Sequence, residues 1–213
     1  MIKVVLFDLW GTLMEQGTYS PLKQSYSILR PRMPLGQFIH LFEKAFMTKS
    51  FQEQTQGFTE VCQAFGIPAR SVIIEQLIGL WNKNRMFAKP YAETFEVLTE
   101  LKKKYKLVLV SNTDCFLGPV VERYELSKYF DAMVFSYEAG KLKNDEGFFS
   151  DVLTKFDVTK EEALMVGDSV ETDMEGAQAA GLRAVLVDRK NNREFAPKVV
   201  SLKDLSKYIE SLS

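Results

Sequence analysis

Short runs of apolar residues recur along the chain, and longer stretches with helical periodicity separate them. The runs are apolar at successive rather than alternate positions and occupy residues 2–7, 107–110, 132–135, 163–166 and 184–187. Successive apolar residues are typical of strands buried on both faces of a parallel sheet. The segments 91–105, 147–156 and 171–180 are long enough for the helices that connect such strands. The pattern predicts an α/β fold with a Rossmann-like, doubly wound parallel sheet.

One long segment, between the first strand and Pro90, interrupts this alternation. Its apolar residues fall on single helical faces, first at Leu35, Phe38, Ile39, Phe42 and Phe46 and then at Val72, Leu77, Leu80 and Trp81. We expect residues 15–88 to form an inserted all-α domain, with the aromatic stripe as its core. Residues 1–14 and 89–213 would then form the α/β core domain.

Composition narrows the classes of partner. Lys and Arg (27) nearly balance Asp and Glu (28), so the whole-chain charge gives no argument for nucleic acid or a membrane surface. No apolar run is long enough for a signal peptide or a membrane span. Cys62 and Cys115 do not have the spacing of a disulfide framework or a zinc site. We expect a cytoplasmic protein with reduced thiols.

Two further features of composition concern the chemistry. His40 is the single histidine, which argues against a multi-histidine metal site or a histidine-dependent triad. The segment 15–88 carries eight basic and five acidic residues, whereas the rest of the chain has an acidic excess. A basic domain above an acidic core would suit a small anionic substrate. Ordinary solvated helix faces would give the same charge difference.

Polar residues follow four of the predicted strands. In a parallel sheet these strand ends meet at one edge, where active sites form. The residues are Asp8, Gly11 and Thr12; Ser111, Asn112, Thr113 and Asp114; Lys141 and Lys143; and Asp168 and Asp173. Three converging carboxylates repel one another unless a hard divalent cation neutralises them, and Mg²⁺ prefers oxygen ligands. With a hydroxyl and a lysine beside them to hold an anion, they predict phosphoryl transfer with a carboxylate nucleophile.

The same four segments resemble the motifs of the haloacid dehalogenase-like hydrolase superfamily. They are "FDLWGTL", "VSNTD", "SYEAGKLKND" and "GDSVETD", in that order, and the resemblance covers essentially the whole chain. The helical insertion after the first strand resembles the mobile cap domain of that family.

The resemblance implies a role for each matching residue. Asp8 would be the nucleophile and a Mg²⁺ ligand, and Ser111 would bind the transferring group beside the amide of Asn112. Lys143 would stabilise the nucleophile and the transition state, although Asn144 replaces the usual proline of this motif and Lys141 is near enough to compete.

The remaining assignments concern the metal and the substrate. The backbone carbonyl of Trp10 and the carboxylate of Asp168 would complete the metal ligands, with Asp173 binding directly or through water. Thr12 and Trp10 would border the substrate. The stretch 14–20 is expected to move with the cap and contact the substrate.

Trp10 departs from the family's phosphatases, which have a second Asp two residues after the nucleophile. That Asp protonates the leaving oxygen and then activates water, and an indole N–H can do neither. Trp10 is compatible with three interpretations. The first is a Mg²⁺-dependent phosphatase-like hydrolase with an altered second step. The second is a metal-independent 2-haloacid dehalogenase, and the third is a low-activity member that binds a phosphorylated ligand.

Each alternative depends on a recognisable residue. Dehalogenases commonly have an aromatic residue at the position of Trp10, but they usually have a neutral residue at that of Asp168, and only Arg30 and Arg32 are candidates for their halide-binding arginine. A phosphonate hydrolase would need a cap lysine, for which Lys44 and Lys49 are the candidates. Because unpaired carboxylates at the site need a cation, the Mg²⁺-dependent hydrolase of a small phosphorylated metabolite is the preferred interpretation.

Overall fold

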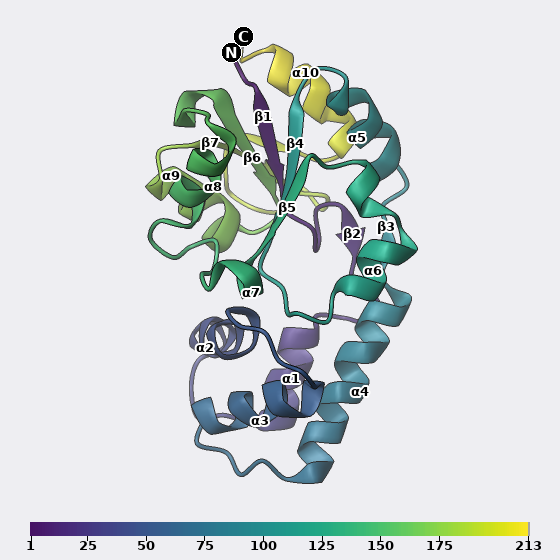
Figure 1. Ribbon diagram of the computed structural model, residues 1–213, viewed down its shortest axis with the longest axis vertical. Helices are drawn as coiled ribbons and strands as arrows, with labels where there is room; N and C mark the ends of the chain where they lie inside the picture. Colours follow the sequence, from purple (N-terminus) through teal and green to yellow (C-terminus); the bar gives the residue numbers. More distant parts are fainter. Residues whose placement is uncertain (213) are drawn as a thin grey trace.

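Six strands form one parallel sheet in the computed structural model, which describes residues 1–212 (Figure 1). Their order across the sheet is β5-β4-β1-β6-β7-β8, and every neighbouring pair is parallel. The strands are β1 (Val4–Phe7), β4 (Lys106–Ser111), β5 (Ala132–Phe135), β6 (Ala163–Gly167), β7 (Arg183–Val187) and β8 (Lys198–Val199). The predicted doubly wound α/β fold is confirmed, and of the six strands of this sheet only the two-residue β8 was not predicted.

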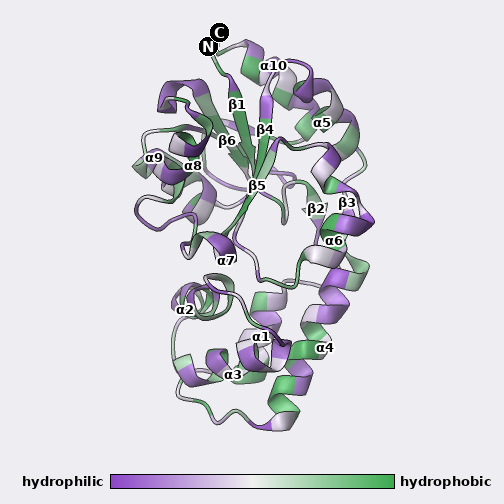
Figure 2. Ribbon diagram, in the orientation of Figure 1, coloured by the Kyte–Doolittle hydropathy of each residue, from purple (hydrophilic) through white to green (hydrophobic). Residues whose placement is uncertain are grey.

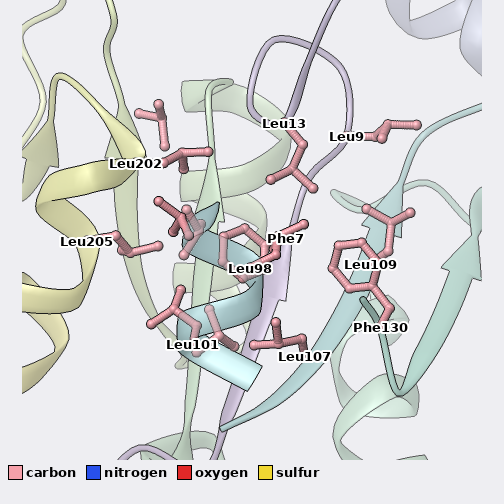
Figure 3. Packing of buried hydrophobic residues seen from close by; sticks show 14 of the residues in the cluster. Phe7, Leu9, Leu13, Leu98, Leu101, Leu107, Leu109, Phe130, Leu202 and Leu205 are labelled. Carbon is pink, nitrogen blue, oxygen red and sulfur yellow. The ribbon is translucent and has the colours of Figure 1, made fainter. Parts of the chain in front are cut away.

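Helices cover both faces of the sheet, which explains why the strands are apolar at successive positions. On one face, Leu98 and Leu101 of α5 (Thr94–Lys102) and Leu205 of α10 (Leu205–Glu210) pack near Phe7 of β1 (Figure 3). On the other face, α8 (Phe148–Phe156) and α9 (Gly176–Ala179) contribute Phe148 and residues around it. The strands therefore form the most continuously apolar part of the chain (Figure 2).

Shorter helical elements complete this domain. They are α6 (Gly118–Arg123), α7 (Ser136–Ala139), the 3₁₀ turns η1 (Leu126–Lys128), η2 (Lys160–Glu162) and η4 (Leu202–Asp204), and the π-helix η3 (Val170–Glu175). The helix expected over 171–180 is thus a π-helical turn followed by α9. Ser169 caps this turn, because its hydroxyl accepts a hydrogen bond from the backbone N–H of Thr172. Single π-helical turns of this kind are frequent at functional sites.

The inserted segment forms a group of helices with a core of its own, below the sheet in Figure 1. They are α1 (Pro21–Leu29), α2 (Leu35–Met47), α3 (Gln54–Ala64) and α4 (Ser71–Phe87). Aromatic rings fill the core, and Phe42 stacks on Trp81 with ring centroids 5.5 Å apart. Val72 was expected to be part of this core, but it lies outside it. It lies in the first turn of α4, and 56% of it is exposed.

A two-stranded antiparallel ribbon connects the insertion to the sheet domain. It consists of β2 (Met14–Glu15) and β3 (Lys89–Pro90), which pair antiparallel on either side of the insertion. Farther along the junction, Arg85 of α4 forms a buried ion pair with Asp114, and Lys44 of α2 pairs with Asp145. Among residues 1–212, no helix combines the length and the apolar character that a membrane crossing needs.

Candidate active site

Asp8 follows β1 and is almost completely buried, with 5% of its surface exposed. Both of its carboxylate oxygens are hydrogen-bonded. Lys143 Nζ donates to Oδ1 at 2.6 Å, and the Thr12 hydroxyl donates to Oδ2 at 3.1 Å. The carboxylate is therefore held in one orientation at the carboxyl edge of the sheet. Thr12, which donates one of these hydrogen bonds, is itself fully buried.

Two more carboxylates converge on Asp8. Asp168 and Asp173 follow β6, and one oxygen from each of the three carboxylates lies within 4.8 Å of the others. Lys143 also forms an ion pair with Asp173, so its ammonium group lies between two of the three acids. Lys141 instead pairs with Asp151 at the surface, at 2.6 Å. Of the two candidate lysines, Lys143 is the one at the site.

Two glycines allow this convergence. Gly11 has a positive φ of 85°, and a Cβ atom there would collide with the carboxylate of Asp168. A Cβ atom at Gly167 would collide with the carboxylate of Asp173. Side chains at these two positions would push the acids apart, so the glycines are required by the close approach of the three carboxylates.

The buried charges at the site affect one another's pKa values. Burial, together with the carboxylates of Asp173 and Asp168, raises the pKa of Asp8 to about 8 against the opposing effect of Lys143. Burial and Asp173 likewise raise the pKa of Asp168 to about 6. Burial disfavours the charged form of Lys143, but Asp173 and Asp8 outweigh it and raise the pKa of that ammonium group above its ordinary range. An additional cation would complete the neutralisation of the three carboxylates.

The segment after β4 supplies a wall of the site. The side-chain carbonyl of Asn112 accepts a hydrogen bond from the backbone N–H of Lys143 at 2.9 Å, which ties this segment to the segment after β5. The Asn112 side-chain N–H₂ donates to Glu43 of α2 at 3.4 Å. Ser111 is fully buried, and its hydroxyl lies 3.5 Å from the carbonyl oxygen of Asn112.

A cleft of about 990 Å³ extends from the three acids to the insertion. Trp10, Asn112 and the segment 15–23 line it, together with basic side chains at Lys23, Lys190 and Arg193. Arg193 lies 3.7 Å from Asp168. Among the site residues predicted from the sequence, Thr12 and Ser111 are buried below the cleft instead of lining it.

Several residues that line the cleft were not predicted from the sequence as site residues. Glu43 and Arg85 belong to the insertion, and Arg193 lies in the segment after β7. None of the three follows a strand directly or belongs to one of the four motifs. The pattern of polar residues at strand ends therefore does not predict them. The one available signal was that Glu43 is a charged residue between Phe42 and Phe46 on an otherwise apolar helix face.

The side chains required by two alternative chemistries lie elsewhere. Arg30 and Arg32, the candidates for a halide-binding arginine, are exposed and are not among the residues that line the cleft. Lys44 and Lys49, the candidates for a Schiff-base lysine, are engaged in ion pairs with Asp145 and Glu60.

A comparison with protein families gives one match along most of the chain. Residues 2–181 match the family described as haloacid dehalogenase-like hydrolase. The match includes the four strand ends described above and the whole helical insertion.

Individual relatives include phosphatases. Human N-acylneuraminate-9-phosphatase is 32% identical over 128 residues, which cover 59% of this chain and 52% of that protein. Glyceraldehyde 3-phosphate phosphatase of Methanothermobacter thermautotrophicus is 25% identical over 200 residues, which cover 88% of this chain and 86% of that protein. The chain thus matches about half the length of the first relative and most of the second.

Among solved structures, 2-haloacid dehalogenase from Pseudomonas syringae superposes with a TM-score of 0.69 over 100% of both chains. The sequence identity is 20%, so this likeness shows the shared fold and does not identify the reaction.

Proposed function

The chain belongs to the haloacid dehalogenase-like hydrolases, and on that premise we propose that it is a Mg²⁺-dependent phosphatase of small phosphorylated metabolites, with Asp8 as the nucleophile. One observation carries the proposal: Asp8, Asp168 and Asp173 bring carboxylate oxygens within 4.8 Å of one another beside Lys143. Such a concentration of negative charge is best explained by a site for a divalent cation. The phosphatases among the relatives support the same choice.

The donor set fits Mg²⁺ chemically. All three side chains offer hard oxygen ligands, and sulfur or imidazole donors are absent from the group. Asp8 and Asp168 would hold the ion with the backbone carbonyl of Trp10, and Asp173 would hold it directly or through water. When bound, the ion supplies positive charge that neutralises the phosphoryl oxygens and the acids.

The protein's own side chains account for the first chemical step. An oxygen of the Asp8 carboxylate attacks the phosphorus, and the bond from phosphorus to the leaving oxygen breaks. The ammonium group of Lys143, already 2.6 Å from Asp8, offsets the negative charge that spreads over the transferring group. The Thr12 hydrogen bond fixes the orientation of the attacking carboxylate. Asn112 would contact the phosphoryl group from the wall of the cleft.

The cleft also suits the proposed substrate class. Its volume of about 990 Å³ is enough for a small metabolite, and Lys23, Lys190 and Arg193 bring positive charge to its lining. The helical insertion would act as the cap domain that covers the substrate and excludes water, with residues 14–20 between cap and core.

A 2-haloacid dehalogenase is the second candidate, favoured by the aromatic residue at Trp10. The exposed positions of Arg30 and Arg32, and the ionisable Asp168 beside Asp8, count against it.

The deciding experiment measures phosphate release from a broad panel of phosphomonoesters, with and without Mg²⁺, by the unmodified protein and by Asp8→Asn. The proposal requires release that depends on both the ion and Asp8. If no ester in the panel is hydrolysed, the phosphatase proposal fails. Chloride release from 2-chloropropionate without metal would then establish the dehalogenase.

A further inference from the structure

Hydrolysis of an alkyl phosphate needs a proton donor at the leaving oxygen. An alkoxide is a poor leaving group near neutral pH, and a positioned acid accelerates its departure by about 10²–10⁴-fold. Trp10, which lines the cleft, offers only a neutral indole N–H. Acid assistance from the protein therefore requires another group that lines the cleft.

Most of the carboxyl groups that line the cleft are already engaged. Asp8, Asp168 and Asp173 form the proposed metal site. Asp114 forms an ion pair with Arg85, and Glu15 forms one with Lys89. Glu171 is exposed to solvent. A carboxyl group that would bind the metal ion, or that already forms an ion pair, is not free to approach the leaving oxygen. This leaves the carboxyl group of Glu43.

Glu43 lies on α2 of the insertion and is half-buried. Within residues 1–212, no lysine or arginine forms an ion pair with it. Its Oε2 accepts a hydrogen bond from Asn112 Nδ2 at 3.4 Å, near the long limit for such a bond, so a substrate oxygen can compete for this carboxyl group.

Asn112 also connects Glu43 to the residues around the nucleophile. The same carboxamide accepts from the backbone N–H of Lys143 at 2.9 Å, and Lys143 Nζ donates to Asp8 at 2.6 Å. A continuous chain of contacts thus joins the acid of the insertion to the acid at the end of β1. Glu43 lines the cleft from α2 of the insertion and Asp8 lines it from the end of β1, so a leaving group that extends from Asp8 towards the insertion would approach Glu43.

The proton affinity of Glu43 suits both donation and acceptance. Burial raises the pKa of Glu43 to about 7; Lys143 and the Asn112 hydrogen bond oppose the increase, and Asp173 and Glu171 add to it. Proton transfer is most effective when the pKa of the group lies near the working pH.

We propose that Glu43 is the general acid and general base that replaces the missing second aspartate of the first motif. This inference rests on the proposed phosphatase function. As Asp8 attacks the phosphorus, the bond to the leaving oxygen breaks, and that oxygen takes the proton of the Glu43 carboxyl group. The Glu43 carboxylate then removes a proton from a water molecule whose oxygen attacks the phosphorus of the aspartyl phosphate. The bond from phosphorus to Asp8 breaks, so that phosphate leaves and both side chains return to their starting states.

The test compares two esters in Glu43→Gln. Glutamine keeps an oxygen that can accept from Asn112, so the structural contact is preserved while proton transfer is lost. The esters are p-nitrophenyl phosphate, whose leaving group needs no proton, and the alkyl phosphate that the unmodified protein hydrolyses fastest. Glu60→Gln, an exposed charge change on α3 of the same insertion, is the matched control.

Glu43→Gln should release about one equivalent of p-nitrophenol per active site in a rapid burst, because phosphoryl transfer to Asp8 proceeds. A steady rate at least 10²-fold below that of the unmodified protein should follow, because water is no longer activated. The alkyl phosphate should give no burst, and Glu60→Gln should behave as the unmodified protein does.

Three results would overturn the inference. Unchanged rates on both esters would mean that Glu43 transfers no proton. Equal losses on both without a burst would mean that Glu43 only positions the insertion. Absence of phosphate release by the unmodified protein would overturn the proposed function itself, and this inference with it.

Discussion

The ammonium group of Lys143 lies 2.6 Å from Oδ1 of Asp8, although 135 residues separate the two in the chain. Lys143 is 2% exposed and pairs with Asp173 as well, so one buried cation serves two buried acids. Buried charges need partners, and removing one partner leaves the others uncompensated. The contact therefore bears on stability as well as on the proposed chemistry.

Replacing Lys143 by Met should lower the free energy of unfolding by about 3 kcal/mol in the absence of Mg²⁺, because Asp8 and Asp173 lose their shared cation. Added Mg²⁺ should recover part of this loss. Urea denaturation with and without the ion measures both effects. Lys141→Met removes an exposed pair with Asp151 and should change stability by less than about 1 kcal/mol. Similar losses in the two variants would contradict the assignment of a special role to Lys143.

Mg²⁺ should stabilise the unmodified protein and not Asp168→Asn. An ion that binds only the folded state adds about 2.7 kcal/mol at a concentration one hundred times its Kd. Thermal unfolding over a series of Mg²⁺ concentrations measures this, with Asp151→Asn as a surface control. An undiminished Mg²⁺-dependent rise in Tm in Asp168→Asn would place the ion elsewhere.

Trp10→Asp should restore steady turnover to Glu43→Gln by at least about tenfold, because a carboxyl group two residues after the nucleophile can take over proton transfer. Trp10→Asn is the matched control, since it makes the same reduction in size without an acid. Trp10 packs partly against the apolar core, so both variants should also lose about 1–3 kcal/mol of stability. Rates are therefore compared below the Tm of each variant. If Trp10→Asp and Trp10→Asn give equal rates in the Glu43→Gln background, an acid at position 10 does not take over proton transfer and the explanation is wrong.

Stability should depend on pH through Glu43. Its folded-state pKa of about 7 lies above the ordinary value of 4.5, so the folded protein binds the proton more tightly than the unfolded chain does. The contribution of this tighter proton binding to the free energy of unfolding is complete below about pH 4.5 and is lost as the pH rises towards 7. Glu43→Gln has no such proton, so its stability relative to the unmodified protein should increase over this interval. At a half-buried side chain the change should be about 1–2 kcal/mol, after allowance for solvent screening. Urea denaturation at several pH values without metal tests this, and a constant difference would contradict the pKa shift.

Arg85→Met should lower the free energy of unfolding by about 3–5 kcal/mol. Arg85 Nη1 donates to both oxygens of Asp114 at 3.1 Å, and removing it leaves a buried carboxylate alone between insertion and core. The double variant Arg85→Met, Asp114→Leu should recover much of the loss, because an apolar pair needs no compensating charge. If the double variant is less stable than Arg85→Met alone, the explanation from an unpaired charge is wrong.

The local pattern of the chain was enough to predict the architecture. Successive apolar residues such as those of Val4–Phe7 must be buried on both faces, and the helical spacing of Phe38, Phe42 and Phe46 requires a covered helix face. Both features act over a few residues and are therefore legible in sequence. The parallel sheet then brings the strand ends together, which places Asp8 near Asp168 before any coordinates are known.

The tertiary structure decided what lies between segments that the sequence does not relate. The ribbon of β2 and β3 sets how the insertion meets the sheet domain, and that geometry brings Glu43 to Asn112 and Arg85 to Asp114. It also buries Thr12 and Ser111, leaves Val72 exposed, and selects Lys143 over Lys141. Periodicity reports which face of an element is buried but not which element covers it, because long-range contacts depend on the relative placement of whole domains.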